Sequence, residues 1–139
     1  MDNYGANEIK TQLIRFFFSS FSNIGVACVE LLYNNENIKY RYNNHSDIID
    51  EESIEYEFTL DNWNNFINKL FEIKINNWKK RYEQKYFQFD GEEWKIEMEF
   101  KKLPKFISTG YDEYPYNWEN FKNIIKEYFP QIEYLKIFD

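Results

Sequence analysis

Two acidic residues and a lysine around a predicted turn have the residue types needed for metal-dependent chemistry. Asp90 precedes Gly91, and Glu93 and Lys95 follow it. Two carboxylates can hold Mg²⁺ while a lysine stabilises the negative charge that develops during hydrolysis. In such sites, however, the first aspartate comes from a separate strand, whereas here both carboxylates lie in or beside one turn. A metal-dependent enzyme that uses Asp90 and Glu93 is therefore an alternative hypothesis and not the leading one.

Nucleophilic catalysis has few candidate residues in this chain. The one histidine, His45, lies among asparagines in a polar stretch, and the one cysteine, Cys28, lies in an apolar run where a small buried side chain is expected. One Cys and one His cannot form a zinc site or an internal disulfide. The four glycines are too scattered for a phosphate-binding loop. We therefore expect no catalytic, metal-binding or cofactor-binding residues.

The acidic residues are concentrated in one stretch that contains no base. The chain of 139 residues has 24 acidic and 17 basic residues, and its formal charge is −7. No Lys or Arg occurs from Tyr42 to Asn68, although seven acids do. They are Asp47, Asp50, Glu51, Glu52, Glu55, Glu57 and Asp61. This stretch therefore accounts for the whole net charge.

A second acidic group, further along the chain, alternates with tyrosine. It consists of Tyr111, Asp112, Glu113, Tyr114 and Tyr116. Tyrosine supplies rigid contact area, and acids speed the association with a basic partner. We therefore predict that this group and the acids at 47, 50, 51, 52, 55 and 57 bind a partner. A charge run is also typical of a solvated face that only keeps a protein in solution, and this alternative stays open.

Strands are expected to carry the first acidic group. β-branched and aromatic residues fill 9–18 and 24–33 with polar residues between them, which predicts two antiparallel strands. Alternation of apolar and polar residues predicts a third strand over 38–42 and a fourth over 54–58, with acids on the outer face of the fourth.

Helices and a hairpin are expected in the second half. Apolar residues at helical spacing predict a helix over 61–72, with Asp61 as its N-cap, and another over 117–129, capped by Asn117. Residues 76–85 are expected to form a short helix or turn. A hairpin over 86–109 is centred on Asp90 and Gly91, with a further strand over 106–109, and the tail 132–138 is expected to add an edge strand.

These elements predict one α+β domain over 1–139, strand-rich from 1 to 59. We expect an antiparallel sheet of about five to seven strands with two principal helices packed on one face. The N-terminus lacks the features of a signal peptide, and no apolar stretch is long enough to cross a bilayer. A cytoplasmic protein is therefore expected.

Aromatic residues and glycines in the second half form a further pattern. Trp78 and Tyr82 give W-x3-Y, Asp90 to Trp94 give DG-x2-W, and Gly110 to Trp118 give G-x3-YP-x2-W. Over 73–128 this pattern resembles that of small bacterial immunity and inhibitor proteins, and the resemblance implies a binding role. The residue types alone indicate a structural role, since aromatics such as Trp94 and Tyr114 are usually part of a core.

The combined expectation is an acidic inhibitor that binds a basic protein. A groove that holds phosphates must be basic, so the partner expected is a nucleic-acid-handling protein, either a nuclease toxin or a defence effector. The protein would then act as a toxin immunity protein or as a phage anti-defence (anti-CRISPR-like) protein. Direct binding of nucleic acid is disfavoured by the net charge, and no membrane contact is expected. A structural subunit of a larger assembly is the remaining alternative, and the oligomeric state stays open.

Overall fold

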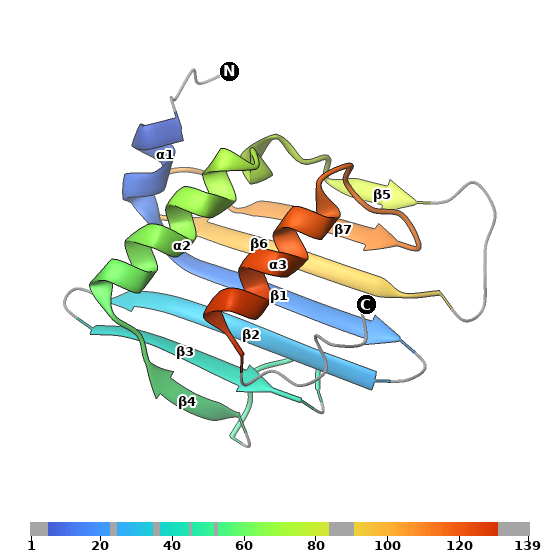
Figure 1. Ribbon diagram of the computed structural model, residues 1–139, viewed down its shortest axis with the longest axis horizontal. Coiled ribbons are helices and arrows are strands. Elements are labelled where there is room, and N and C mark those ends of the chain that lie inside the picture. Colours follow the sequence, from blue (N-terminus) through green and yellow to red (C-terminus); the bar gives the residue numbers. More distant parts are fainter. Residues whose placement is uncertain are drawn as a thin grey trace.

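Two helices cross one face of a single β-sheet (Figure 1). The computed structural model describes residues 6–22, 25–34, 37–44, 46–51, 53–83 and 91–130. Within these ranges seven strands pair in the order β4-β3-β2-β1-β6-β7-β5, and all neighbours are antiparallel except β5 and β7. The predicted α+β class and the two helices on one face are confirmed.

The first three strands form an antiparallel meander, as the sequence predicts. They are β1 (Leu13–Ser22), β2 (Gly25–Asn34) and β3 (Asn37–Asn43). Residues 9–12 were predicted to extend β1, but they belong to the helix α1 (Ala6–Gln12). The reason is that β6 (Glu93–Phe100) pairs only as far as Leu13, so no strand remains beside residues 9–12.

The remaining strands lie at the two edges of the sheet. β4 (Ile54–Glu57) pairs with β3 at one edge, and β7 (Phe106–Tyr111) confirms the strand predicted over 106–109. At the other edge β5 (Arg81–Glu83) replaces part of the predicted helix or turn, which is limited to the 3-10 turn η1 (Ile75–Asn77). β5 joins the sheet because Thr109 N–H and Ser108 Oγ donate to the carbonyl oxygens of Lys80 and Lys79. The first arm of the hairpin predicted over 86–109 and the predicted edge strand over 132–138 lie outside the described residues.

Both principal helices are present, but their N-terminal caps differ from prediction. In α2 (Leu60–Glu72) the N-cap is Thr59, whose Oγ1 accepts a hydrogen bond of 3.0 Å from Asn62 N–H, while Asp61 lies in the first turn. In α3 (Trp118–Tyr128) Asn117 occupies the N-cap position without capping. Its side chain instead accepts from Trp78 Nε1 and donates to the carbonyl oxygen of Ile73. Asn117 therefore ties α3 to the connection that follows α2.

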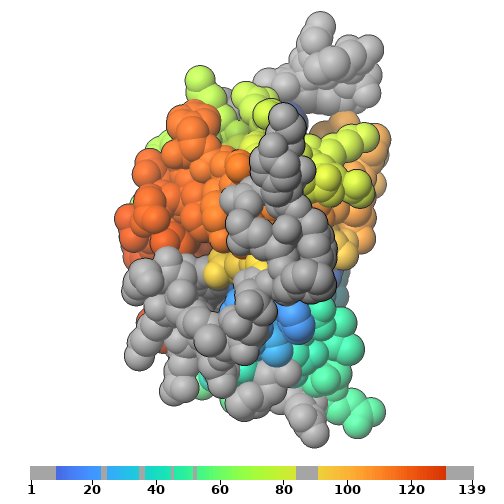
Figure 2. Space-filling model, turned by 90° about the vertical axis from the view of Figure 1, so that its right-hand side faces the viewer, coloured from blue at the N-terminus to red at the C-terminus, as the bar shows by residue number. Residues whose placement is uncertain are grey.

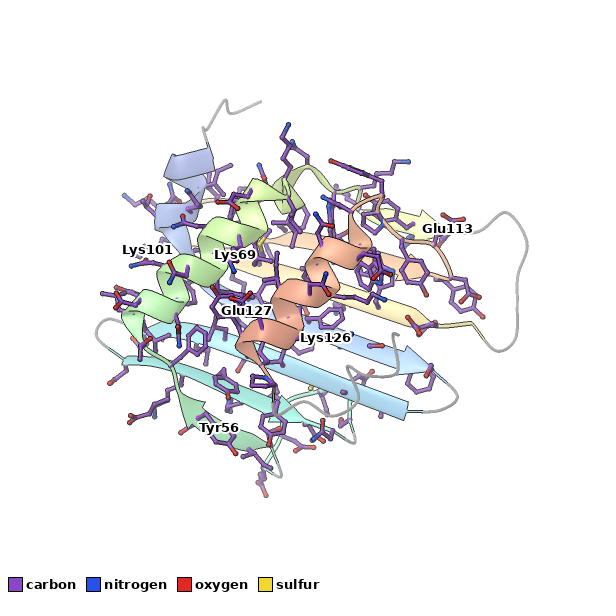
Figure 3. The ribbon with its side chains drawn as sticks, viewed as in Figure 1. Tyr56, Lys69, Lys101, Glu113, Lys126 and Glu127 are labelled. Carbon is purple, nitrogen blue, oxygen red and sulfur yellow. The ribbon has the colours of Figure 1, made fainter. Side chains whose placement is uncertain are left out.

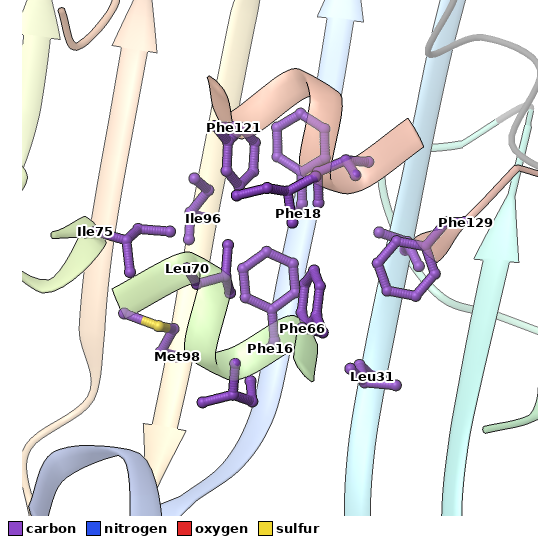
Figure 4. Close-up of a cluster of buried hydrophobic side chains, with 14 of the residues drawn as sticks. Phe16, Phe18, Leu31, Phe66, Leu70, Ile75, Ile96, Met98, Phe121 and Phe129 are labelled. Carbon is purple, nitrogen blue, oxygen red and sulfur yellow. The ribbon is translucent and has the colours of Figure 1, made fainter. Parts of the chain in front are cut away.

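The core lies between the sheet and these helices (Figure 4). Phe16 and Phe18 of β1 meet Phe66 of α2 and Phe121 of α3 edge to face, with centroids 5.2 and 5.1 Å apart. Each large side chain buried in this way stabilises the fold by about 1.5 to 3 kcal/mol. The side chains of β1 that alternate with these point to the opposite face of the sheet, which none of the described helices covers.

Candidate functional site

The face of the sheet opposite the helices, here called the helix-free face, carries ion pairs across neighbouring strands. Glu30 of β2 lies between two arginines: its Oε2 is 2.7 Å from Arg15 Nε, and its Oε1 contacts Arg41 Nη2. Burial alone would raise the pKa of Glu30, but the hydrogen bonds from Arg15 and Arg41 outweigh it and the pKa is lowered. Glu30 is therefore a charged, fully compensated group.

Glu97 of β6 has the same kind of environment. It contacts Lys95 at 3.2 Å and Lys105, and these hydrogen bonds lower its pKa although burial acts in the opposite direction. Glu99, on the same strand, pairs with Arg15 at 3.3 Å. The acids in the middle of the helix-free face are thus paired with bases, so they contribute little negative charge that could attract a partner.

Residues 46–51 cross the helix-free face after β3. Asp47, Ile48 and Ile49 line a hollow of about 340 Å³ together with side chains of β1, β2 and β6. Figure 2 shows the teal-green residues around the end of β3 on one side of the molecule and α3, in orange, on the other side. Asn43 Nδ2 donates to Asp50 Oδ1 at 3.3 Å, which fastens this segment to β3.

Cys28 lies on the same face and is only 2% exposed. Burial raises the pKa of its thiol to about 12, although a hydrogen bond with the backbone of Asn43 acts in the opposite direction, and the charges of Asp47 and Asp50 add smaller increases. The prediction that Cys28 is a small buried side chain is confirmed.

The edge strand β4 presents acids on one side and apolar groups on the other. All four of its residues are exposed, and Glu55 and Glu57 lie on the helix-free side. Glu55 is 3.4 Å from Lys39, but both side chains are about half exposed, so this pair contributes little to stability. On the other side Tyr56 stacks on Tyr40, with ring centroids 5.4 Å apart.

The first predicted group of acids lies mostly along this edge. Asp50 and Glu51 form the turn that precedes β4 and are exposed, as are Glu55 and Glu57. We call these four residues the acidic edge. Asp47 lies further in, at the hollow on the helix-free face, and Glu52 is outside the described residues.

The second predicted group lies far from the acidic edge. It begins in β7, and the strands β3, β2, β1 and β6 separate β7 from β4. Figure 3 shows Glu113 and Tyr56 at opposite edges of the sheet. The structure therefore does not bring the acidic edge and the second group together into one surface.

Most of the second group holds its own loop in place. Asp112 Oδ1 accepts from Glu92 N–H at 2.7 Å, and Tyr114 OH donates to Glu92 Oε1 at 3.0 Å. The backbone oxygen of Glu113 accepts from Trp94 Nε1 at 2.9 Å. Burial raises the pKa of Glu92, and the charge of Asp112 adds to it, while the hydrogen bond from Tyr114 lowers it. Burial also raises the pKa of Tyr114.

The two other tyrosines of the second group lie at or near the surface. Tyr116 is 92% exposed, and Tyr111 lines a hollow of about 410 Å³ that also contains Asp47 and Lys95. Asp47 of the first predicted group and Tyr111 of the second therefore line the same hollow.

The aromatic and glycine pattern of the second half corresponds to a packing cluster. Trp94 contacts Trp118, Tyr82 and Trp78, with ring centroids 4.8, 5.7 and 5.9 Å apart. A Cβ atom on Gly110 would lie 2.0 Å from Trp94 Nε1, so only glycine fits beside this ring. The pattern thus describes how the core is built, in agreement with the structural role that the residue types indicate.

Residues that the sequence analysis weighed for catalysis do not gather in the described part of the chain. Glu93 is exposed at the start of β6, while Asp90 and His45 lie outside the described residues. Within the ranges that the structure describes, no group of three or more His, Cys, Asp or Glu could hold a metal ion. None of the described helices is long and apolar enough to span a membrane.

The sequence analysis missed the ion pairs of the helix-free face. Arg15, Glu30 and Arg41 come from three strands and meet only because of the strand register, which pairs Glu30 with Arg41. The alternation within each strand was visible, but the register was not. Comparison with known proteins adds no relative, since neither a protein-family model nor a curated protein matches the chain.

Proposed function

We propose that this protein binds a basic partner protein and masks the surface that the partner uses on nucleic acid. The supporting observation is the position of the exposed glutamates. Glu30, Glu97 and Glu99 pair with arginines and lysines, whereas Glu51, Glu55 and Glu57 of the acidic edge are exposed, and the pair of Glu55 with Lys39 is weak. Exposed carboxylates therefore line β4 and the turn before it.

The physical chemistry of such binding favours a nucleic-acid-handling partner. A protein that holds phosphates needs a coherent basic groove, and an acidic protein of this size is attracted to it over a long range. Complementary charge raises the association rate and suppresses the wrong partners. A nuclease toxin or a defence effector has such a groove, so a toxin immunity or phage anti-defence role is the function that we propose.

The test compares two charge variants of equal net charge. The edge variant carries Glu51→Gln, Glu55→Gln and Glu57→Gln, and the control variant carries Glu72→Gln, Glu83→Gln and Glu93→Gln, which are exposed elsewhere. A partner is first isolated from the source cells with the unmodified protein, and its association rate is then measured by stopped flow at increasing salt.

We expect the edge variant to associate at least about tenfold more slowly at low salt, with a shallower salt dependence, and the control variant to stay close to the unmodified protein. If the partner is a nuclease, the edge variant also inhibits it less. Equal effects of the two variants, or no effect of the edge variant, would remove the acidic edge from the mechanism.

A further inference from the structure

β4 forms an edge of the sheet, and its pairing with β3 decides which backbone groups remain free. Phe58 N–H donates to the carbonyl oxygen of Ile38 at 2.9 Å, which makes these two opposed residues a hydrogen-bonded pair. In an antiparallel ladder such pairs alternate, so Tyr56 is bonded to Tyr40 in the same way. The N–H and C=O groups of Glu55 and Glu57 must therefore point away from β3.

This edge can accept another strand. Among the described residues β4 is the last strand of the sheet, with no strand on its outer side. An added strand would pair with Glu55 and Glu57 through about four backbone hydrogen bonds. Residues directly opposite these glutamates would lie on the helix-free side, next to two carboxylates, and basic side chains fit there.

The other side of the same edge has a different character. A hollow of about 510 Å³ lies on the helix side of β4. Its lining combines the rings of Tyr40, Tyr56, Phe58 and Tyr128 with the polar side chains of Asn62, Asn65 and Glu127. Ile54 and Tyr56 are 49% and 39% exposed. Apolar side chains that alternate with the basic ones would reach this surface. An added strand with an alternating pattern of basic and apolar residues thus matches both sides of β4.

The charge of the edge also selects against a second copy of this chain. Two acidic edges placed side by side would bring Glu55 and Glu57 close to their own copies, and like charges on neighbouring strands are destabilising. We propose that β4 binds an extended segment of the partner protein by strand addition, with alternate Lys or Arg residues of that segment opposite Glu55 and Glu57. This inference rests on the proposed function and specifies how its basic partner is held.

The probe for this binding mode is a ten-residue peptide of alternating lysine and valine. Its control is the same peptide methylated on the backbone nitrogen of each lysine, which keeps the charge but removes the donors that would pair with β4. Binding is measured by calorimetry with the unmodified protein, the edge variant and the control variant defined above. Hydrogen exchange of the Glu55 and Glu57 amides is followed by NMR in the same samples.

We expect both amides to exchange rapidly in the free protein and at least tenfold more slowly with saturating peptide. Methylation of the peptide and the edge variant should each weaken binding at least tenfold, and the control variant should bind as the unmodified protein does. Amides already protected in the free protein would show that the edge is occupied by this chain or a second copy, and would overturn the proposal. So would a lack of binding at millimolar peptide.

One outcome separates this inference from the proposed function. If the methylated peptide binds as tightly as the unmethylated one, and binding still weakens with salt and in the edge variant, charge alone holds the peptide. Strand addition is then wrong, while the acidic edge remains the binding surface. The stopped-flow comparison with the isolated partner decides the proposed function independently of the peptide.

Discussion

Glu30 connects β2 to both of its neighbours on the helix-free face. Arg15 of β1 and Arg41 of β3 reach it from either side, and only 7% of Glu30 is exposed. Removing one member of a buried charge group is costly because the remaining charges lose their compensation. Single side chains at this point therefore have effects on stability that exposed acids of β4 do not have.

The substitution Glu30→Gln should lower the free energy of unfolding by about 2 kcal/mol at pH 7. Although burial opposes it, the net effect of the two arginines is to hold the pKa of Glu30 below its ordinary value of 4.5. The contribution of this carboxylate is thus fully present above the pKa of the unfolded state and is lost as the pH falls through the folded pKa. Urea unfolding at pH 7 and pH 3 should show a smaller difference between the two proteins at pH 3. Glu57→Gln is the exposed control, and an equal loss at both pH values would contradict this account.

Glu92 should behave in the opposite way. Burial and Asp112 raise its pKa, so the folded protein binds this proton more tightly than the unfolded chain and stability from this group decreases as the pH rises. Glu92→Gln keeps an oxygen that can accept from Tyr114 OH and removes the charge. We expect a higher melting temperature than that of the unmodified protein at pH 8 and no gain at pH 4. Glu93→Gln, next to it and exposed, is the control, and a lower melting temperature of Glu92→Gln at pH 8 would show that the charged form is favoured.

At the scale of elements, β4 joins the sheet through only part of its backbone. The N–H of Tyr56 belongs to the ladder with β3, whereas that of Glu55 points outward. Proline lacks this donor and is tolerated in strands only where the N–H faces solvent.

The two proline variants of β4 should therefore differ in stability. Tyr56→Pro should lower the free energy of unfolding by about 1 to 3 kcal/mol because a ladder hydrogen bond is lost, and Glu55→Pro by clearly less. Urea unfolding measures both, and Tyr56→Ala separates the loss of ring stacking on Tyr40 from the loss of the hydrogen bond. If Glu55→Pro is the more damaging variant, the backbone of β4 has the opposite orientation and strand addition as described is impossible.

Elements also show where prediction from sequence succeeds and where it fails. β-branched and aromatic content was sufficient for β2 and for β1 from Leu13 onward, and alternation was sufficient for β3 and β4. The apolar stripes were sufficient for α2 and α3. The N-cap of α2 is Thr59, two positions before the predicted Asp61. The spacing of apolar residues does not determine the first residue of a helix this closely. β5 was missed because its three residues pair with β7, and a pair so short leaves no alternation in the sequence.

At the scale of the molecule, β1 is the strand on which the topology depends. It pairs with β2, its neighbour in sequence, and with β6, which is far away along the chain. This second pairing places β7, with Tyr111 at its end, on one side of β1 and the acidic edge on the other. Sequence alone indicated the two groups of the candidate site, but their separation follows from a long-range pairing that no local pattern reveals.

Hydrogen exchange should reflect this arrangement. Strand amides with partners on both sides and a core beneath them open only with the whole fold, whereas edge strands open locally. We expect the slowest exchange in β1, followed by β2 and β6, and the fastest strand exchange in β4 and β5. NMR-detected exchange at neutral pH measures this order. Slow exchange of the amides in β4 together with fast exchange of those in β6 would contradict this order, because the most stable part of the sheet would then not be centred on β1.

The buried position of Cys28 provides a built-in reporter. The thiol is buried, the charges of Asp47 and Asp50 act on it, and its pKa is raised to about 12, so a disulfide-exchange reagent can modify it only when this part of the fold opens. The labelling rate then measures how often the structure opens around Cys28, near the residues that precede the acidic edge. A molecule bound to β4 would stabilise the residues that lead into it and slow the labelling of Cys28. The labelling rate of this cysteine would therefore report binding at β4 without an added dye.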